Sequence, residues 1–256
     1  MTQKSKTLVN CLKILNRKER YWLLRQALGK KNFDLDKEFV GSLETALNGS
    51  ALIKKDGGIQ ICKNAWWAMD YHLDWIAVAL QLYSNKSNLD LSADSEKKIS
   101  NCFEGNNRYC LKSNGKKTPL VRGTALDADL IVAYDNTLIL IEAKGDGSWG
   151  RKQMMKKITR LNELHDFAES LGINMYLVLC SPGETKVHVP DKKKPSQKAG
   201  VPWQEWALLD GEKPIHITLE FGKKDVGLFH PKRSNKNEKT GEYSNLKFEK
   251  RPRTRR

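Results

Sequence analysis

Two acidic residues and a lysine stand beside apolar segments in the middle of the 256-residue chain. Asp129 precedes the run Leu-Ile-Val, and thirteen residues further on Glu142 opens the triplet Glu-Ala-Lys, which ends at Lys144. Carboxylates beside apolar strands need a compensating charge, and Mg²⁺ is held by one or two carboxylates together with water and phosphate oxygens. These residue types therefore predict a divalent-cation site that receives a phosphodiester, with Lys144 orienting or deprotonating the attacking water.

Two predicted strands position these residues. The segments 125–134 and 137–144 are rich in Leu, Ile and Val, and Asp135-Asn136 between them is a favourable two-residue turn. A hairpin with this turn pairs residues whose numbers sum to 271, so Asp129 lies opposite Glu142. Cross-strand partners project on the same face of a sheet, which predicts that the two carboxylates meet.

The same register places Asp127 opposite Lys144, so four charged residues gather at the end of the hairpin far from the turn. Asp129 and Glu142 are the predicted ligands of the metal, and the carbonyl of Ala143 is a further one. A salt-bridged charge cluster without a metal is the alternative interpretation of this end of the sheet.

The rest of the chain supplies elements on both sides of this hairpin. The pattern predicts helices over 5–28, 35–47, 64–83 (with Asn64 as N-cap), 150–171 (ending at Gly172) and 203–209. It predicts strands over 117–122, 174–180 and 214–221. The C-terminal segment is either a hairpin of 226–230 with 243–248 or a basic tail. The predicted regions are an N-terminal helical region at 1–63, an α/β core at 64–221 and a basic C-terminal hairpin or tail at 222–256. Strands that precede and follow a helix behind three N-terminal helices indicate an α/β or α+β class.

Asp129-Leu-Ile-Val followed by Glu142-Ala143-Lys144 resembles the PD-(D/E)XK nuclease superfamily, over residues 64–181. The resemblance implies a restriction-endonuclease-like fold, in which a mixed central sheet is flanked by helices, here with an N-terminal helical layer. It also implies an endonuclease of restriction, phage-defence or DNA-repair type that uses Mg²⁺, with Mn²⁺ as a substitute. Gln153 matches a glutamine that many members carry in the helix after the E-x-K triplet.

The chain departs from the family pattern at two points. No proline precedes the aspartate, and the local sequence Ala-Leu-Asp-Ala-Asp leaves Asp127 as a competitor of Asp129 for the same role. The acidic residue that many members place on the first core helix has three candidates here, Asp70, Asp74 and Glu44.

The net positive charge of the chain indicates what kind of partner it binds. The chain has 45 Lys and Arg against 30 Asp and Glu, a net charge of +15, and residues 232–256 alone hold ten Lys or Arg and three Glu. Such a surface fits a polyanion, which we expect to be DNA, with RNA as an alternative. Six residues near the start of the predicted helix 150–171 are candidate nucleic-acid contacts: Trp149, Arg151, Lys152, Lys156, Lys157 and Arg160. The alternative is a solvated helix face for the five basic residues and a packing role for Trp149.

The other residue types narrow the function classes. The longest apolar runs are six residues, far below a membrane span, and the first residues carry no secretory signal pattern. Five cysteines without a CxxC pair and five scattered histidines argue against a thiolate zinc site and a disulfide framework. We therefore expect a cytoplasmic protein without a membrane partner. Double-strand cutting would favour a homodimer, and the competing functions are a non-catalytic nucleic-acid-binding protein of the same fold and an RNA-processing nuclease.

Overall fold

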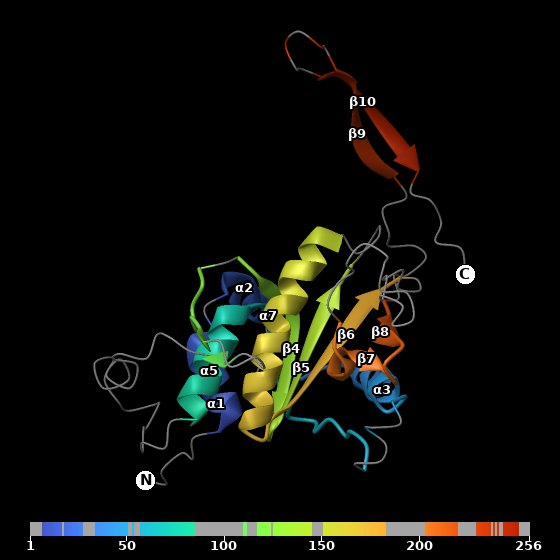
Figure 1. Ribbon diagram of the computed structural model, residues 1–256. Coiled ribbons are helices and arrows are strands. Elements are labelled where there is room, and N and C mark those ends of the chain that lie inside the picture. Colours follow the sequence, from blue (N-terminus) through green and yellow to red (C-terminus); the bar gives the residue numbers. More distant parts are fainter. Residues whose placement is uncertain are drawn as a thin grey trace.

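The computed structural model describes residues 7–16, 18–27, 34–50, 53, 57–84, 110–111, 117–123, 125–144, 151–182, 203–219, 229–236, 238, 240 and 243–250. Within these residues, helices surround a six-stranded mixed sheet, and two separate two-stranded sheets are present (Figure 1). The predicted mixed α/β class is confirmed.

The helices described are α1 (Leu8–Leu15), α2 (Glu19–Ala27), α3 (Lys37–Leu47), α5 (Leu73–Ser84), α7 (Arg151–Ser170) and the short 3₁₀ helix η1 (Glu205–Ala207). The strands described are β1 (Trp66–His72), β2 (Cys110–Leu111), β3 (Lys117–Thr118), β4 (Asp127–Tyr134), β5 (Thr137–Ala143), β6 (Asn174–Ser181), β7 (Leu208–Leu209), β8 (Lys213–Thr218), β9 (Phe229–Lys236) and β10 (Tyr243–Lys250). The order of strands in the large sheet is β1-β4-β5-β6-β8-β7.

The hairpin of β4 and β5 has the predicted turn and register. The strands pair antiparallel from Tyr134 opposite Thr137 to Leu130 opposite Ile141, so paired residue numbers sum to 271. Asp135 takes a left-handed φ of 42° in the turn, a conformation that aspartate tolerates better than most residues. Because β4 and β5 lie in the middle of the sheet, their apolar side chains are buried on both faces.

A helical crossover joins β5 to β6. The two strands run parallel, and α7 between them packs over the sheet (Figure 1). Gly172 has a φ of +69° directly after α7, which is the conformation that ends a helix at glycine. The predicted helix over 150–171 and the strand over 174–180 are both confirmed.

The predicted helix over 64–83 is wrong in its first half. Trp66–His72 forms the edge strand β1, paired antiparallel with β4, and the helix begins only at Leu73. Pairing with β4 buries Trp67, Ala68 and Tyr71, and this tertiary burial outweighs the helical pattern that the segment shares with α5. The first strand of the antiparallel group is therefore β1.

Three other predicted boundaries differ. The helix over 5–28 is broken into α1 and α2, because Asn16 ends α1 with an extended ψ of 100°. Of the predicted strand 117–122, only the two residues of β3 are extended, and they pair with β2. The predicted helix 203–209 is the three-residue η1 followed by β7. By contrast, the predicted helix over 35–47 is confirmed as α3, and the predicted strand over 214–221 is confirmed as the shorter β8.

Helices α1 and α2 pack on the β1 side of the molecule, whereas α3 packs against β8 on the other side of the sheet (Figure 1). The Tyr71 hydroxyl of β1 donates to the carbonyl of Leu12 in α1 at 2.8 Å, and Tyr21 of α2 meets Trp67 edge to face at 5.3 Å between ring centroids. α1 also packs against α5, which lies beside α7 (Figure 1). Of the N-terminal helices, α1 and α2 are thus attached directly to the strand next to β4.

The C-terminal segment forms a hairpin. β9 and β10 pair antiparallel, with Lys247 opposite Lys232 and Phe248 opposite Pro231. The predicted C-terminal hairpin is confirmed, although its first strand is 229–236 and the predicted partner was 226–230. In the part of the chain that the structure describes, no helix is long and apolar enough to cross a membrane.

Candidate functional site at the end of the β4–β5 hairpin

Asp129 reaches across the end of the hairpin to β5. The amide of Ala143 donates to Asp129 Oδ2 at 2.6 Å, just beyond the last backbone pair of the ladder at Leu130 and Ile141. The side chain of Asp129 therefore takes the place of a backbone acceptor at this end of β5. This contact brings the aspartate to the Glu-Ala-Lys triplet, as the register predicts.

Glu142 is the buried carboxylate of the group. It is 4% exposed, and burial raises its pKa from 4.5 to about 7. The negative charges of Asp129 and Asp127 raise the pKa further, while the ion pair with Lys157 lowers it. Both aspartates therefore act electrostatically on the Glu142 carboxylate.

Lys157 of α7 is the direct partner of Glu142. Its ammonium lies 2.5 Å from Glu142 Oε2, and the lysine is only 7% exposed. This burial contradicts the alternative interpretation, in which Lys157 belongs to a solvated basic helix face. A signal was present in the sequence, because Lys157 is three residues after Met154 and four before Leu161, which places it on the buried stripe of the helix.

Asp127 is held by the N-terminal layer. Lys18, between α1 and α2, forms an ion pair with Asp127 Oδ2 at 2.7 Å and lies 5.9 Å above the ring of Trp75. The other oxygen, Asp127 Oδ1, is buried and has no hydrogen-bond partner within the described stretches. An acceptor of this kind has an unsatisfied lone pair that a cation or a bound water would satisfy.

Lys144 extends the group toward β6. Its backbone amide donates to the carbonyl of Cys180 at 2.8 Å, and the residue is partly exposed. The backbone hydrogen bonds between β5 and β6 therefore continue as far as Lys144, the lysine of the E-x-K triplet. This contact holds the backbone of Lys144 at the carboxyl end of β5, where the residue is partly exposed.

The other predicted nucleic-acid contacts fall into three groups. Lys156 is exposed on α7, as predicted. Arg151 and Lys152 lie in the first turn of α7, where the structure describes the backbone alone, and so does Gln153, the predicted catalytic glutamine. Trp149 lies outside the described residues, so its role stays a prediction.

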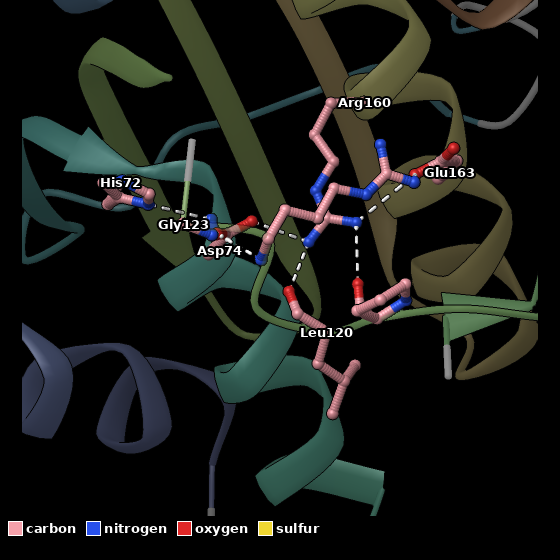
Figure 2. Close-up of polar contacts among 8 residues, drawn as sticks. His72, Asp74, Leu120, Gly123, Arg160 and Glu163 are labelled. Atoms are coloured by element: carbon pink, nitrogen blue, oxygen red, sulfur yellow. Dashed lines mark hydrogen bonds and ion pairs between the residues drawn. The ribbon is translucent and has the colours of Figure 1, made fainter. Parts of the chain in front are cut away.

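Arg160 corrects the prediction a second time, because it is 1% exposed and cannot lie on a solvated helix face. Figure 2 shows it in a network of buried polar contacts. Arg160 donates to Asp74 Oδ1 at 2.8 Å, to the carbonyls of Pro119 and Leu120, and to Glu163 Oε2 at 3.3 Å. Its guanidinium thereby ties α5, α7 and the segment before β4 together.

Asp74 completes this network at the first turn of α5. Its second oxygen accepts the backbone amides of Arg122 at 2.7 Å and Gly123 at 3.0 Å, and its own amide donates to Nδ1 of His72 at 3.2 Å (Figure 2). The side chain of Arg122 returns to Glu163 at 2.5 Å. Since residues 119–123 lead into β4, this network fixes the approach of the chain to Asp127 and Asp129.

The three candidates for an additional acid have separate partners. Asp74 belongs to the network above. Asp70 lies near the end of β1 with a left-handed φ of 48° and pairs with Arg20 at 3.2 Å. Glu44 of α3 accepts the amide of Ile61 at 2.7 Å. Each of these contacts holds backbone or helix positions in the fold.

The donor atoms at the hairpin end fit a hard divalent cation. Asp129 and Glu142 each use one carboxylate oxygen in the contacts above, which leaves the second oxygen of each, and the carbonyl of Ala143 directly follows Glu142 in the chain. The unsatisfied Asp127 Oδ1 adds another oxygen acceptor. Across the described ranges, no three His, Cys, Asp or Glu side chains form a ready metal-holding group. Oxygen donors of this kind are the ligands of Mg²⁺, which takes one or two carboxylates and completes its shell with water and phosphate oxygens.

Comparisons of the chain with protein-family models, with curated proteins and with solved structures found no match.

Proposed function

We propose that the protein is a Mg²⁺-dependent endonuclease that hydrolyses phosphodiester bonds of DNA. The observation that carries the proposal is that Asp129 accepts the amide of Ala143, the residue after Glu142, and that its charge acts on the buried Glu142 carboxylate. A buried sheet rarely places two carboxylates together unless a cation or substrate compensates them. The lysine of the triplet, Lys144, supplies a positive charge at the same edge.

Each residue has a chemical role in this proposal. Asp129 and Glu142 hold the cation, and the carbonyl of Ala143 is a further ligand. A bound Mg²⁺ supplies Lewis-acid stabilisation of the charge that develops on the phosphoryl oxygens. Lys144 orients or deprotonates the attacking water and offsets negative charge in the transition state. Asp127, held by Lys18, adds negative potential to the site.

The topology also supports the nuclease proposal. β1, β4 and β5 form an antiparallel group, β6 is parallel to β5, and α7 is the crossover between them, which agrees with the strand order of a restriction-endonuclease-like core. The order of elements departs from that core at one point, because α5 lies between β1 and β4 in the chain. The net charge of +15 supports a nucleic-acid substrate.

A non-catalytic nucleic-acid-binding protein is the second candidate. The ion pair of Glu142 with Lys157 favours it, because the lysine already compensates the buried carboxylate without a metal. A protein of this kind would bind DNA and leave it intact.

Nicking of supercoiled plasmid in Mg²⁺ and in EDTA tests the proposal. Asp129→Asn and Glu142→Gln keep the hydrogen-bonding shape of each side chain and remove its charge, so we expect at least about a 100-fold loss of nicking. The matched control is Asp135→Asn, which removes a carboxylate from the turn of the same hairpin at a position where asparagine tolerates the left-handed φ. Asp127→Asn should cost less, because this residue is bound to Lys18.

Binding in Ca²⁺ separates the two candidates. A gel shift should show that Asp129→Asn and Glu142→Gln bind DNA as well as the wild-type protein or better, since each removes a negative charge from a surface that receives phosphates. Tight DNA binding by a wild-type protein that nicks neither DNA nor a matched RNA in Mg²⁺ would leave the non-catalytic candidate. Wild-type nicking by Glu142→Gln would reject the site.

A further inference from the structure

The centre of the candidate site is a buried ion pair between sheet and helix. Lys157 Nζ lies 2.5 Å from Glu142 Oε2, and both side chains are almost completely buried. The lysine comes from α7, one turn before Arg160, whose guanidinium is buried against Asp74. The inner face of α7 therefore carries two cations, and each is paired with a carboxylate from a different element.

The charges around Glu142 do not cancel residue by residue. Lys18 and Lys157 form ion pairs with Asp127 and Glu142, whereas the third carboxylate, Asp129, is bound by the neutral amide of Ala143. Asp129 raises the electrostatic energy of ionised Glu142. A buried Glu–Lys pair is itself a weak source of stability, because both ions lose their hydration. An arrangement that served stability alone would use an apolar residue at position 142, as β5 does at its neighbours.

We propose that Lys157 is a positioning residue of the candidate site, and that its ammonium sets how strongly the site takes a divalent cation. The ammonium binds Glu142 Oε2, so its positive charge opposes a cation at the other oxygen of the same carboxylate, and it holds the carboxylate directed toward α7. This inference rests on the assignment of Glu142 as a metal ligand in the proposed function. A lysine with a merely structural role would affect stability equally with and without a metal.

The chain offers a matched control one residue away. Lys156 lies on the same helix and carries the same charge, but it is exposed and points away from the buried stripe. Lys156→Met and Lys157→Met therefore change net charge and helix composition identically. Only the second removes the countercharge of Glu142.

Thermal melting at pH 8.5, in EDTA and over a titration of Mn²⁺, measures the effect with the full-length protein. We expect Lys157→Met to lower Tm in EDTA. We also expect Mn²⁺ to recover about half of that decrease or more, at a Mn²⁺ concentration about tenfold below that needed by the wild type, because the metal then binds without a competing ammonium. Lys156→Met should respond to Mn²⁺ as the wild type does. The double variant Glu142→Gln/Lys157→Met should lose the enhanced response, since the carboxylate that gains the metal is gone.

A second variant keeps the test valid if Lys157→Met does not fold. Lys157→Gln retains an N–H donor for Glu142 and removes the charge, so it should show the same enhanced Mn²⁺ response. Equal responses of wild type and the Lys157 variants would overturn the inference. Plasmid nicking distinguishes this result from failure of the proposed function. If the wild type nicks DNA while the Mn²⁺ responses are equal, only the role of Lys157 is rejected. If the wild type does not nick DNA while the Mn²⁺ responses differ, only the endonuclease function is rejected.

Discussion

Glu142 is the residue at which structural and chemical demands on this protein conflict. It occupies a buried position in the central strand β5, directly after Ile141 and opposite Leu179 of β6. Its charge is unfavourable there because burial removes hydration, and two aspartates add repulsion. The ammonium of Lys157 is the compensating group. Perturbed carboxylates of this kind are concentrated at functional sites in proteins.

The raised pKa of Glu142 predicts a particular dependence of stability on pH. The folded protein keeps the proton of this carboxyl up to about pH 7, whereas the unfolded chain releases it near 4.5, so the folded state holds more protons between these values. The contribution of Glu142 to the free energy of unfolding is therefore fully present below about pH 4.5 and is lost as the pH rises through 7, by up to about 3 kcal/mol.

Urea unfolding in EDTA at pH 5 and at pH 8 measures this change. The difference in unfolding free energy between the wild type and Glu142→Gln should fall between the two values, because glutamine does not titrate. Asp135→Asn serves as the comparison for removal of an exposed carboxylate. A difference that stays constant or rises with pH would contradict the raised pKa.

At the scale of elements, the packing of α7 is stabilised by its two buried cations. Lys157 joins the helix to β5, and Arg160 joins it to α5 and to the carbonyls of the segment that leads into β4. These contacts place the helix over the carboxyl end of β5. The geometry of the candidate site therefore depends on contacts of two residues that lie about one turn apart on α7.

Arg160→Met is expected to destabilise the protein by about 3–5 kcal/mol, because it leaves Asp74 as a buried charge without its guanidinium partner. Arg20→Met is the matched control. It removes an arginine that pairs with Asp70 while being 76% exposed, and an exposed pair contributes less than about 1 kcal/mol. Chemical denaturation of the two variants gives the comparison. Similar decreases in stability for both would contradict the buried network as a source of stability.

At the scale of the whole molecule, positive charge is concentrated in a separate element. The β9–β10 hairpin forms its own two-stranded sheet, and residues 229–256 hold ten Lys or Arg and three Glu. Two lysines, Lys232 and Lys247, are directly opposite each other in its register. We therefore expect this hairpin to contribute to DNA binding.

Deletion of residues 229–256 should weaken DNA binding in Ca²⁺ and flatten its dependence on salt. The log–log slope should fall by about 0.9 for each DNA phosphate that the hairpin neutralises in the full-length protein. The Tm of the remaining protein should change little, because the two strands pair with each other. Lys232→Gln/Lys247→Gln is the control that keeps the hairpin and removes two charges. An unchanged salt slope in the deleted protein would show that the hairpin does not touch DNA.

Local patterns in the sequence were enough to predict several elements and the shared end of the hairpin. Asp135-Asn136 sets the register of β4 and β5, and register places Asp129 near Glu142 without reference to the rest of the chain. The helix α7 and the strand β6 follow from periodicity and from the helix stop at Gly172. The mixed class follows from the order of these elements.

Only the tertiary structure decided which charged residues are partners and how residues 66–72 fold. The segment is a strand because β4 offers it an edge, although its own pattern is compatible with a helix. Arg160 and Asp74 are 86 positions apart, and Lys18 and Asp127 are 109 apart. Local periodicity carries no information on contacts of that separation, because they are created by the packing of helices on the sheet. The basic residues of α7 therefore look alike in sequence, while packing exposes Lys156 and buries Lys157 against Glu142.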